Sequence, residues 1–215
     1  MTDFAAARRN MVDGQVRTTD VTDLRLISAM LEVPRERFVP PASSALAYLD
    51  RDVPVGGSRC LLRPMVIAKL IQAAGLSPTD RVLDVGCATG YGAALLGRIA
   101  GQVVALEQDS ELAAAARDSL RSQPNVTVTA GKLIEGSPQS GPYDAILVEG
   151  ATEVVPHVLC QQLKDGGRLV CVLGSDPAAK AMLYLRSSGD VAGRPIFDAT
   201  APLLPGFAKA LEFAF

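Results

Sequence analysis

The stretch VLDVGCATGYG, residues 82–92, joins strand-forming apolar residues to an acidic residue, Asp84, and a glycine-rich turn. Its apolar run is nearly continuous, which is typical of a parallel strand covered by helices on both faces. Similar runs occur in QVVALE, NVTVT, YDAILV and RLVCVLG, at residues 102–107, 125–129, 143–148 and 168–174. These five segments predict one sheet, with the glycine turn at the end of its first strand.

Helical patterns alternate with the predicted strands. PMVIAKLIQAAG begins at Pro64, a favoured first residue of a helix, and stops at Gly75. Further helices are predicted over residues 91–100, 110–122 and 154–167. The turn-rich residues 131–142 predict a loop with at most one helical turn. Because crossovers between parallel strands are right-handed, this order predicts a doubly wound, Rossmann-like α/β sandwich.

The first part of the chain differs from this alternating middle. Helical patterns there are broken by proline-rich segments, and one helix is predicted to begin with Thr22 as its N-cap. Its inward face is expected to carry Leu24, Ile27 and Leu31. We expect residues 1–63 to form a helical cap over the rest of the chain.

The remainder, residues 64–215, is expected to form the α/β core and, with the cap, one structural unit. Near the end, residues 179–190 and 194–215 predict final strands of the sheet or a short terminal helix. The sequence leaves the conformation of residues 195–215 open.

Charge and hydropathy argue against two classes of partner. The formal net charge is -2, with basic and acidic residues mixed along the chain, so no nucleic-acid partner is expected. No run approaches the roughly 20 apolar residues that cross a bilayer, and the first residues, MTDFAAARRNMVDG, lack the apolar stretch of a signal peptide. We expect a cytoplasmic protein without a membrane partner, and the oligomeric state is not predicted.

The residues that commonly bind metals are scattered. The four cysteines are Cys60, Cys87, Cys160 and Cys171, without a C-x-x-C pair, and His157 is the single histidine. Structural zinc sites normally need closer ligand spacings. The sequence therefore predicts buried thiols in a reducing compartment and no metal.

Two cofactor classes use a strand, a glycine turn and a helix N-terminus: dinucleotides and S-adenosylmethionine. The dinucleotide fingerprint G-x-G-x-x-G fails because Tyr91 stands at its third glycine. The chain instead reads D-x-G-x-A-x-G at residues 84–90, which resembles the first motif of class I methyltransferases. Gly86 and Gly90 allow the backbone to approach the methionine part of the cofactor, and Asp84 is suited to its ammonium group.

A second carboxylate supports this interpretation. Glu107 ends the next predicted strand, about 20 residues after Gly86, where a carboxylate accepts hydrogen bonds from both ribose hydroxyls. An ordinary strand-to-helix turn would explain the glycines alone, but not an acidic residue at this spacing. The combination predicts a site for S-adenosylmethionine.

The resemblance extends far beyond the glycine turn. The segments ARRNMVDGQV, ISAMLEVPRERFVP, AYLDRDVPVG, VLDVGCATGY, PYDAILVEGA, LCQQLKDGGRLV and PLLP occur in an order that resembles protein-L-isoaspartate O-methyltransferases. They cover most of the chain, and residues 33–40 and 47–56 are more specific than the glycine turn. The resemblance implies methyl transfer from S-adenosylmethionine, leaving S-adenosylhomocysteine, to the carboxylate of isoaspartyl residues in damaged peptides or proteins.

This chemistry needs few catalytic groups. An isoaspartyl carboxylate is ionised at neutral pH and the sulfonium is an activated donor, so the enzyme chiefly aligns oxygen, methyl carbon and sulfur. A single histidine is therefore compatible with the implied reaction.

The segment before Pro64 departs from the family pattern. Where the family has G-Q-T-I-S-x-P, this chain reads SRCLLRP, which places Cys60 at the threonine and Leu62 at the serine. The resemblance implies that these positions line the acceptor site. Losing one hydroxyl that bonded a carboxylate costs about 1.5–3 kcal/mol, so a slower reaction is expected. Arg59 or Arg63 is expected to hold the acceptor carboxylate instead.

A second departure follows the third predicted strand. The family commonly has Gly-Asp there, with the carboxylate meeting the adenine amino group, whereas this chain has Gly131 and Lys132. Lysine has no acceptor, so we expect cofactor binding weaker by about 1 kcal/mol. The predicted cofactor-binding residues are Asp84, Gly86, Cys87, Ala88, Gly90, Glu107, Gln108, Gly131 and Lys132.

Three functions remain open at this point. The first is an isoaspartyl methyltransferase with an altered acceptor loop. The second is a methyltransferase of the same fold that acts on another carboxylate or a small acceptor. The third is a module that keeps the fold and the cofactor site but binds a partner without catalysis.

Overall fold

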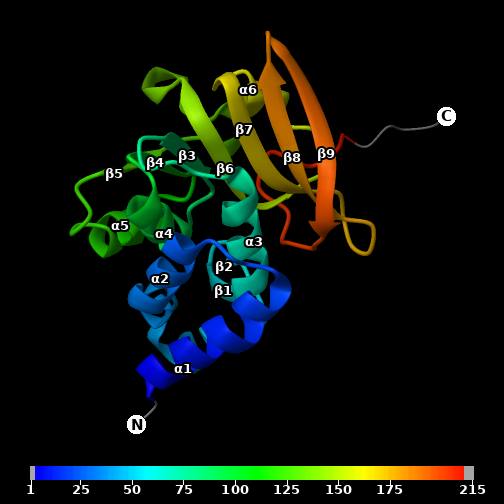
Figure 1. Cartoon of the computed structure of the whole chain (residues 1–215). Helices are drawn as coiled ribbons and strands as arrows, with labels where there is room; N and C mark the ends of the chain where they lie inside the picture. The colour runs from blue at the N-terminus through cyan, green and yellow to red at the C-terminus, as the bar shows by residue number, and fades with distance from the viewer. Residues whose placement is uncertain (1–2, 211–215) are drawn as a thin grey trace, which may run out of the picture.

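The computed structural model describes residues 3–210 and confirms the predicted α/β class (Figure 1). Seven strands form one sheet in the order β5-β4-β3-β6-β7-β8-β9, parallel from β5 to β7 and antiparallel from β7 to β9. The strands are β3 Arg81–Val85, β4 Gln102–Glu107, β5 Val126–Ala130, β6 Tyr143–Thr152, β7 Leu163–Leu173, β8 Lys180–Ser187 and β9 Asp190–Asp198. A separate hairpin consists of β1 Val53–Gly56 and β2 Arg59–Leu61.

The two faces of the sheet are covered unequally. Helices α1–α5 pack on one face, where they share a core with Val82, Leu147 and Val170. The opposite face, with Leu83 and Ile146, is covered by α6 and by Leu204 and Phe207 near the C-terminal end. The helices are α1 Phe4–Met11, α2 Leu24–Glu32, α3 Pro64–Ala74, α4 Tyr91–Ile99, α5 Ser110–Ser119 and α6 His157–Cys160.

Shorter helical segments complete the chain. They are a π-helical turn, Val12–Val16, and the 3-10 helices Arg17–Thr19, Arg35–Phe38, Pro41–Leu46, Leu133–Glu135 and Pro138–Ser140. The loop over residues 131–142 thus holds two short 3-10 helices, one more than predicted. No helix among residues 3–210 is long and apolar enough to cross a membrane.

Local sequence signals set two of the helices. α3 begins at Pro64 and ends before Gly75, which has a φ of +57° as its C-cap, so the prediction for this helix is confirmed. α5 is capped by Asp109, whose Oδ1 accepts hydrogen bonds from the amides of Glu111 (2.9 Å) and Leu112 (3.0 Å). α3 therefore ends shortly before β3, and α5 begins directly after β4 and connects it to β5.

The prediction for α2 was wrong in its cap and in part of its buried face. Asp23, not Thr22, is the N-cap, and its Oδ1 accepts a hydrogen bond from the amide of Arg25 (2.9 Å). Leu24 is 73% exposed, because α2 packs against α1, α3 and α4 together instead of against one stripe. The buried positions are Leu26, Ile27, Ala29 and Met30, and Leu31 is half-buried.

The helix predicted over residues 154–167 was wrong for most of its length. α6 has only four residues, and the chain enters β7 at Leu163. Tyr143 pairs with Leu163 and Ala145 with Arg168, so residues 164–167 form a bulge in β7. Gly166 has a φ of +76° in this bulge, a conformation that an α-helix excludes.

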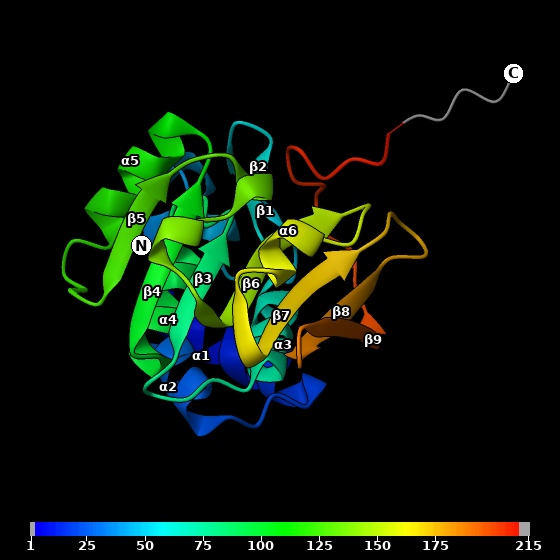
Figure 2. The same ribbon diagram turned by 90° about the horizontal axis from the view of Figure 1, so that it is seen from above.

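At the C-terminal end, residues 179–190 and the start of the segment 194–215 were predicted to form strands or a short helix. The structure has strands there, β8 and β9. Residues 199–210 then return to β6, where Leu203 forms a parallel bridge with Ala151. Figure 2 shows this segment, in red, beside the hairpin β1–β2. The rest of the terminal helix or strand expected up to residue 215 lies outside the described residues.

The N-terminal segment contributes to the same core as the sheet. Met11, Leu26 and Met30 are buried in one apolar cluster with Ile67 of α3 and Leu95 of α4. In Figure 1, α1 and α2 lie beneath α3 and α4. We propose that the segment up to residue 63 and the α/β core unfold as one unit, as the sequence led us to expect.

A pair of leucines on α2 tests this proposal. Leu26 is fully buried, so Leu26→Ala is expected to lower the free energy of unfolding by about 2–5 kcal/mol. Leu24→Ala, the matched control on the exposed face, is expected to change it by less than about 0.5 kcal/mol. Urea denaturation followed by circular dichroism gives both values. Two separate transitions, with Leu26→Ala moving only one, would contradict a single unit.

Candidate cofactor and acceptor site

The glycine turn closes the carboxyl end of β3 and leads into α4. Gly86, Ala88 and Gly90 have φ values of +79°, +50° and +97°, a left-handed conformation that glycine adopts most readily. The amides of Gly86 and Cys87 donate to the carbonyl of Leu106 in β4 (2.8 and 3.1 Å). The turn is thus fixed to the neighbouring strand, just before that strand ends in Glu107.

Glu107 is buried and ties the turn to the next helix. Its Oε2 accepts a hydrogen bond from the amide of Ala88 (2.8 Å). Its Oε1 accepts from the amides of Gln108 (2.8 Å) and Asp109 (3.1 Å). These bonds orient the carboxylate that the sequence assigns to the ribose.

Arg59 comes from the hairpin β1–β2 and lies over the turn. Its Nε is 3.4 Å from Oε2 of Glu107, and its Nη2 donates to the carbonyl of Gly86. Only 3% of this side chain is exposed. A Cβ at Gly86 would displace the guanidinium of Arg59, and the φ of +79° at this residue independently favours glycine. Arg59 therefore faces the groups predicted to bind the cofactor.

A second pair of acids lies below the turn on the same face of the sheet. Asp84 of β3 and Glu149 of β6 are both buried, and Asp84 pairs in register with Leu147, two residues before Glu149 on the same face of the sheet. Neither oxygen of Asp84, nor Oε1 of Glu149, has a hydrogen-bond partner among residues 3–210. Burial raises the pKa of Asp84 to about 7, with a smaller contribution from the charge of Glu107. Burial and the charge of Asp84 raise the pKa of Glu149 well above its ordinary value.

The sequence analysis did not single out two of the groups around this pair. Glu149 is the one acid in the otherwise apolar strand segment AILVEGA, and this was the only feature of the sequence that could have indicated a role for it. Arg35 is fully buried: its Nε donates to the carbonyl of Ala47 (2.6 Å) and its Nη2 to the carbonyl of Leu62 (2.7 Å). Its guanidinium also stacks on the ring of Tyr91, 4.6 Å from the centroid. Arg35 thus positions the backbone of the segment before Pro64.

The predicted acceptor residues are spread over both sides of that segment. Leu62 is buried in the main core, while Cys60 in β2 is half-buried, and burial followed by the charge of Asp52 raises its pKa. Arg63 lies 3.4 Å from a carboxylate oxygen of Asp52 and 3.5 Å from the hydroxyl of Thr200. Its side chain is 33% exposed. Arg63 is therefore reachable by a solute, whereas Arg59 is engaged with the glycine turn.

The predicted adenine contacts lie at the start of the loop after β5. Gly131 donates its amide to the carbonyl of Glu107 (3.1 Å), and Oε1 of Gln108 accepts from the amide of Leu133 (3.5 Å). Lys132 points outward, 2.9 Å from Glu135, and its side chain is 70% exposed. A hollow of about 370 Å³ opens beside these groups. Its lining residues include Gly57, Arg59, Glu107, Gln108, Asp109 and Pro205.

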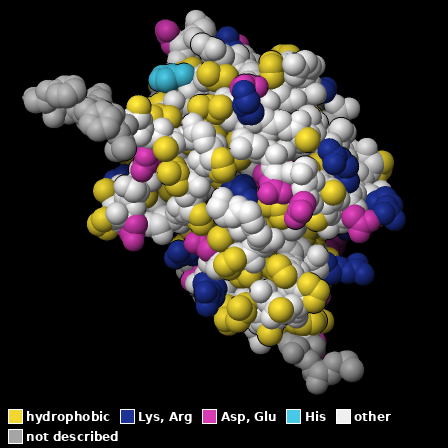
Figure 3. All heavy atoms as spheres, turned by 180° about the vertical axis from the view of Figure 1, so that it is seen from behind, with side chains coloured by type: hydrophobic (Ala, Val, Ile, Leu, Met, Phe, Trp, Pro, Cys, Tyr) yellow, Lys and Arg dark blue, Asp and Glu magenta, His cyan; other side chains and the backbone are white. Residues whose placement is uncertain are grey.

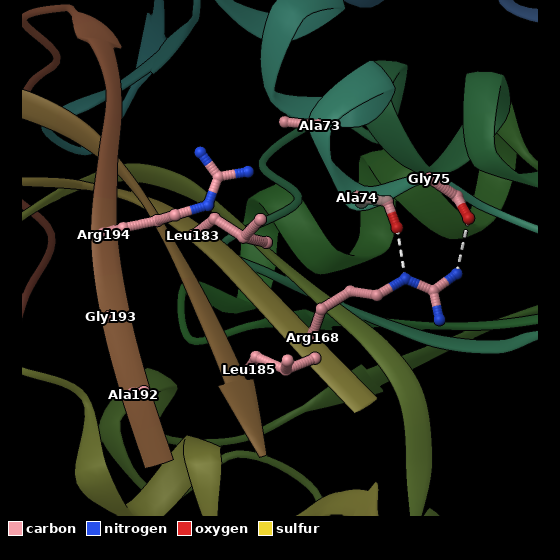
Figure 4. A pocket seen from close by; sticks show the side chains of 9 residues that line it. All are labelled: Ala73, Ala74, Gly75, Arg168, Leu183, Leu185, Ala192, Gly193 and Arg194. Carbon is pink, nitrogen blue, oxygen red and sulfur yellow. Dashed lines mark hydrogen bonds between the residues drawn. The ribbon is translucent and has the colours of Figure 1, made fainter. Parts of the chain in front are cut away.

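A second hollow, of about 440 Å³, lies at the other edge of the sheet between α3 and β8–β9 (Figure 4). Leu183 and Leu185 line it, and Arg194 of β9 reaches its rim. Arg168 is held there by the carbonyls of Ala74 and Gly75. None of the predicted site residues belongs to this hollow.

The surface charge of the protein is mixed. On the face shown in Figure 3, acidic and basic side chains are interspersed.

Comparison with known proteins places this geometry in a family. Residues 7–197 match the model of the protein-L-isoaspartate(D-aspartate) O-methyltransferase family. The chain belongs to this family. That confirms the predicted recognition, the class I methyltransferase fold, and an enzyme that takes its methyl group from S-adenosylmethionine.

Relatives in bacteria and solved structures agree. Protein-L-isoaspartate O-methyltransferases of Koribacter versatilis and Roseiflexus castenholzii are 39% and 41% identical over 188 and 190 residues. These alignments cover 86% and 87% of this chain and 84% and 86% of the relatives. A solved protein-L-isoaspartate O-methyltransferase superposes with a TM-score of 0.81 at 25% identity, covering 93% of this chain and 66% of that one. A Plasmodium falciparum structure titled as a putative member in complex with S-adenosyl-L-homocysteine gives a TM-score of 0.77 at 18% identity, covering 95% and 99%, and supports the fold.

The described residues fit a sulfonium cofactor with an amino-acid tail. The partnerless oxygens of Asp84 suit its ammonium group, and the hollow beside Glu107 suits its ribose. The guanidinium of Arg59 lies between these two places and bonds to Gly86 and Glu107. Arg59 therefore contributes positive charge beside both places.

The buried acid pair predicts a pH-dependent stability. Asp84 has a pKa raised from 3.8 to about 7, so its contribution to stability is complete below about pH 4 and is lost as pH rises through about 7. The free energy of unfolding should therefore fall by about 2–3 kcal/mol between pH 5 and pH 8 from this group. Glu149→Gln should flatten this fall, because an amide can donate to an ionised Asp84. Urea denaturation across this pH range measures both slopes, and equal slopes would contradict the assignment.

Proposed function

We propose that this protein transfers a methyl group from S-adenosylmethionine to the carboxylate of isoaspartyl residues in peptides and proteins. The observation that carries the proposal is the junction of the glycine turn with Glu107 in a chain about 40% identical to named isoaspartyl methyltransferases. The proposed cofactor residues are those predicted from the sequence. A cytoplasmic location and the absence of nucleic-acid and membrane partners stay predictions.

Each proposed cofactor contact follows from a described position. Glu107 is oriented by three backbone amides toward the hollow beside β4 and accepts the ribose hydroxyls. Gly86 gives the backbone room for close approach, and Asp84 supplies a carboxylate for the ammonium group. The cofactor supplies an activated methyl group on its sulfonium.

The acceptor carboxylate is proposed to bind at Arg63. Of the two arginines considered, Arg59 is buried against Glu107, whereas Arg63 is partly exposed and lies beside Asp52 and Thr200. Thr200 also offers a hydroxyl 3.5 Å from Arg63, whereas Cys60 and Leu62 carry none. These groups hold an ionised nucleophile in position without a general base, because the carboxylate is the attacking group.

The direct test is transfer of labelled methyl from S-adenosylmethionine to an isoaspartyl peptide, compared with the same peptide containing aspartate. We expect labelling of the isoaspartyl peptide alone. Arg63→Ala should raise the acceptor KM about ten- to a hundredfold, since a charge-assisted hydrogen bond is worth about 1.5–3 kcal/mol. It should leave the Kd for S-adenosylhomocysteine unchanged.

Arg194→Ala is the matched control, because this arginine lies at the hollow on the far edge of the sheet. An acceptor KM that responds to Arg194 and not to Arg63 would move the acceptor site to that hollow. Cofactor binding without labelling of either peptide would favour another acceptor or a binding role over the proposed one.

The adenine position gives a separate prediction. Lys132→Asp is expected to lower the Kd for S-adenosylhomocysteine about two- to tenfold, because a carboxylate there accepts a hydrogen bond worth about 0.5–1.5 kcal/mol. Lys132→Ala removes the ion pair with Glu135 without adding an acceptor, and serves as the control. Isothermal titration calorimetry measures both. An equal gain from the two variants would show that loss of the lysine, and not the new acceptor, matters.

A further inference from the structure

Glu149 stands where β6 passes the end of β3. Asp84 pairs in register with Leu147, so Glu149 lies two residues further along β6 on the same face of the sheet. Gly92 of α4 makes room for it, since a Cβ at that glycine would collide with the carboxyl group of Glu149. The last glycine of the stretch 82–92 is thus explained by an acid on another strand.

The charges around this pair do not balance. Three buried acids, Asp84, Glu107 and Glu149, face two buried guanidiniums, Arg35 and Arg59. In their ionised forms these five groups carry one excess negative charge. The remaining titratable groups that face the pair are Tyr91 and Cys87, both neutral near pH 7 because burial raises their pKa values. The site is therefore short of one positive charge.

A proton supplies that charge in the protein alone. Two neighbouring carboxylates repel each other and have no hydrogen to share, so a hydrogen bond can form between Asp84 and Glu149 only when one of them is protonated. Exposure of 0% and 3% removes the water that would otherwise separate the two charges. Two buried, neighbouring carboxyl groups whose oxygens lack other partners among residues 3–210 thus indicate one proton held between them.

We propose that Glu149 is a positioning residue of the cofactor site: with Asp84 it holds one proton, which leaves when the cofactor's ammonium group binds beside the pair. The inference rests on the proposed function, since it needs the ammonium group at Asp84. The proton passes to solvent, and the ammonium group keeps its own protons and donates to both carboxylates. Binding exchanges one positive charge for another, so the buried charge stays constant.

The measurement is calorimetric titration of the full-length protein with S-adenosylhomocysteine in buffers of different ionisation enthalpy. At pH 6.5 we expect release of about 0.8 proton per cofactor bound, the fraction of a group with a pKa near 7 that is protonated. The Kd should fall about 10- to 30-fold from pH 5.5 to pH 7.5, because the proton competes with the ligand. The ammonium and carboxylate groups of the ligand do not titrate in this range.

Two variants and a second ligand isolate the pair. Glu149→Gln should release almost no proton and bind with a Kd that is independent of pH, because its amide donates to an ionised Asp84. Glu153→Gln is the matched control: Glu153 lies four residues further on and accepts a hydrogen bond from the amide of Lys209 (2.8 Å), so wild-type behaviour is expected. 5′-Methylthioadenosine lacks the amino-acid tail, so its binding should release no proton.

The outcomes separate this inference from the proposed function. Binding of S-adenosylhomocysteine without proton release, or with equal release in wild type and Glu149→Gln, would overturn the role of Glu149 and leave the cofactor site intact. Equal release with 5′-methylthioadenosine would place the proton elsewhere and overturn it too. If S-adenosylhomocysteine does not bind at any pH, the cofactor site itself is wrong.

Discussion

The carboxylate of Glu107 is buried where three segments meet, and its hydrogen bonds hold them together. Backbone amides of the glycine turn, of the residue after β4 and of the cap of α5 all donate to it, and Arg59 adds a contact from the hairpin β1–β2. A buried carboxylate is costly unless its lone pairs are filled. Satisfying Glu107 therefore fixes the shape of the turn and the position of the hairpin at once.

The same junction sets the electrostatics of the site. Acids at the ends of β3, β4 and β6 converge because parallel strands end at one edge of the sheet. Arg35 and Arg59 arrive from the N-terminal segment, outside the α/β core, and offset most of that charge. The cap thus contributes to the site as well as to the hydrophobic core.

Much of the site was readable in the sequence because its determinants are local. The glycines of residues 82–92 serve a turn within that stretch, and Glu107 lies at a spacing set by one βα unit. Glu149 and Arg35 were missed because their roles depend on contacts across 65 and 12 residues, with Asp84 and Ala47 respectively, which no periodicity encodes. The cap of α2 was a local error, because Asp23 is itself a favoured N-cap residue, next to the predicted Thr22. The helix predicted over residues 154–167 failed because pairing between β6 and β7 overrode the local pattern.

By itself, the sequence determined the α/β class, which segments of the chain form the five parallel strands, the helix that begins at Pro64 and stops at Gly75, the glycine turn and the family. These follow from hydrophobic periodicity, backbone conformational preferences and local spacing. Only the tertiary structure decided that Arg59 lies on the turn while Arg63 stays partly exposed. It also decided that Glu149, a second acid near Asp84, fills the room that Gly92 leaves by having no side chain. The physical reason is that burial and charge pairing depend on which distant segments the fold brings together.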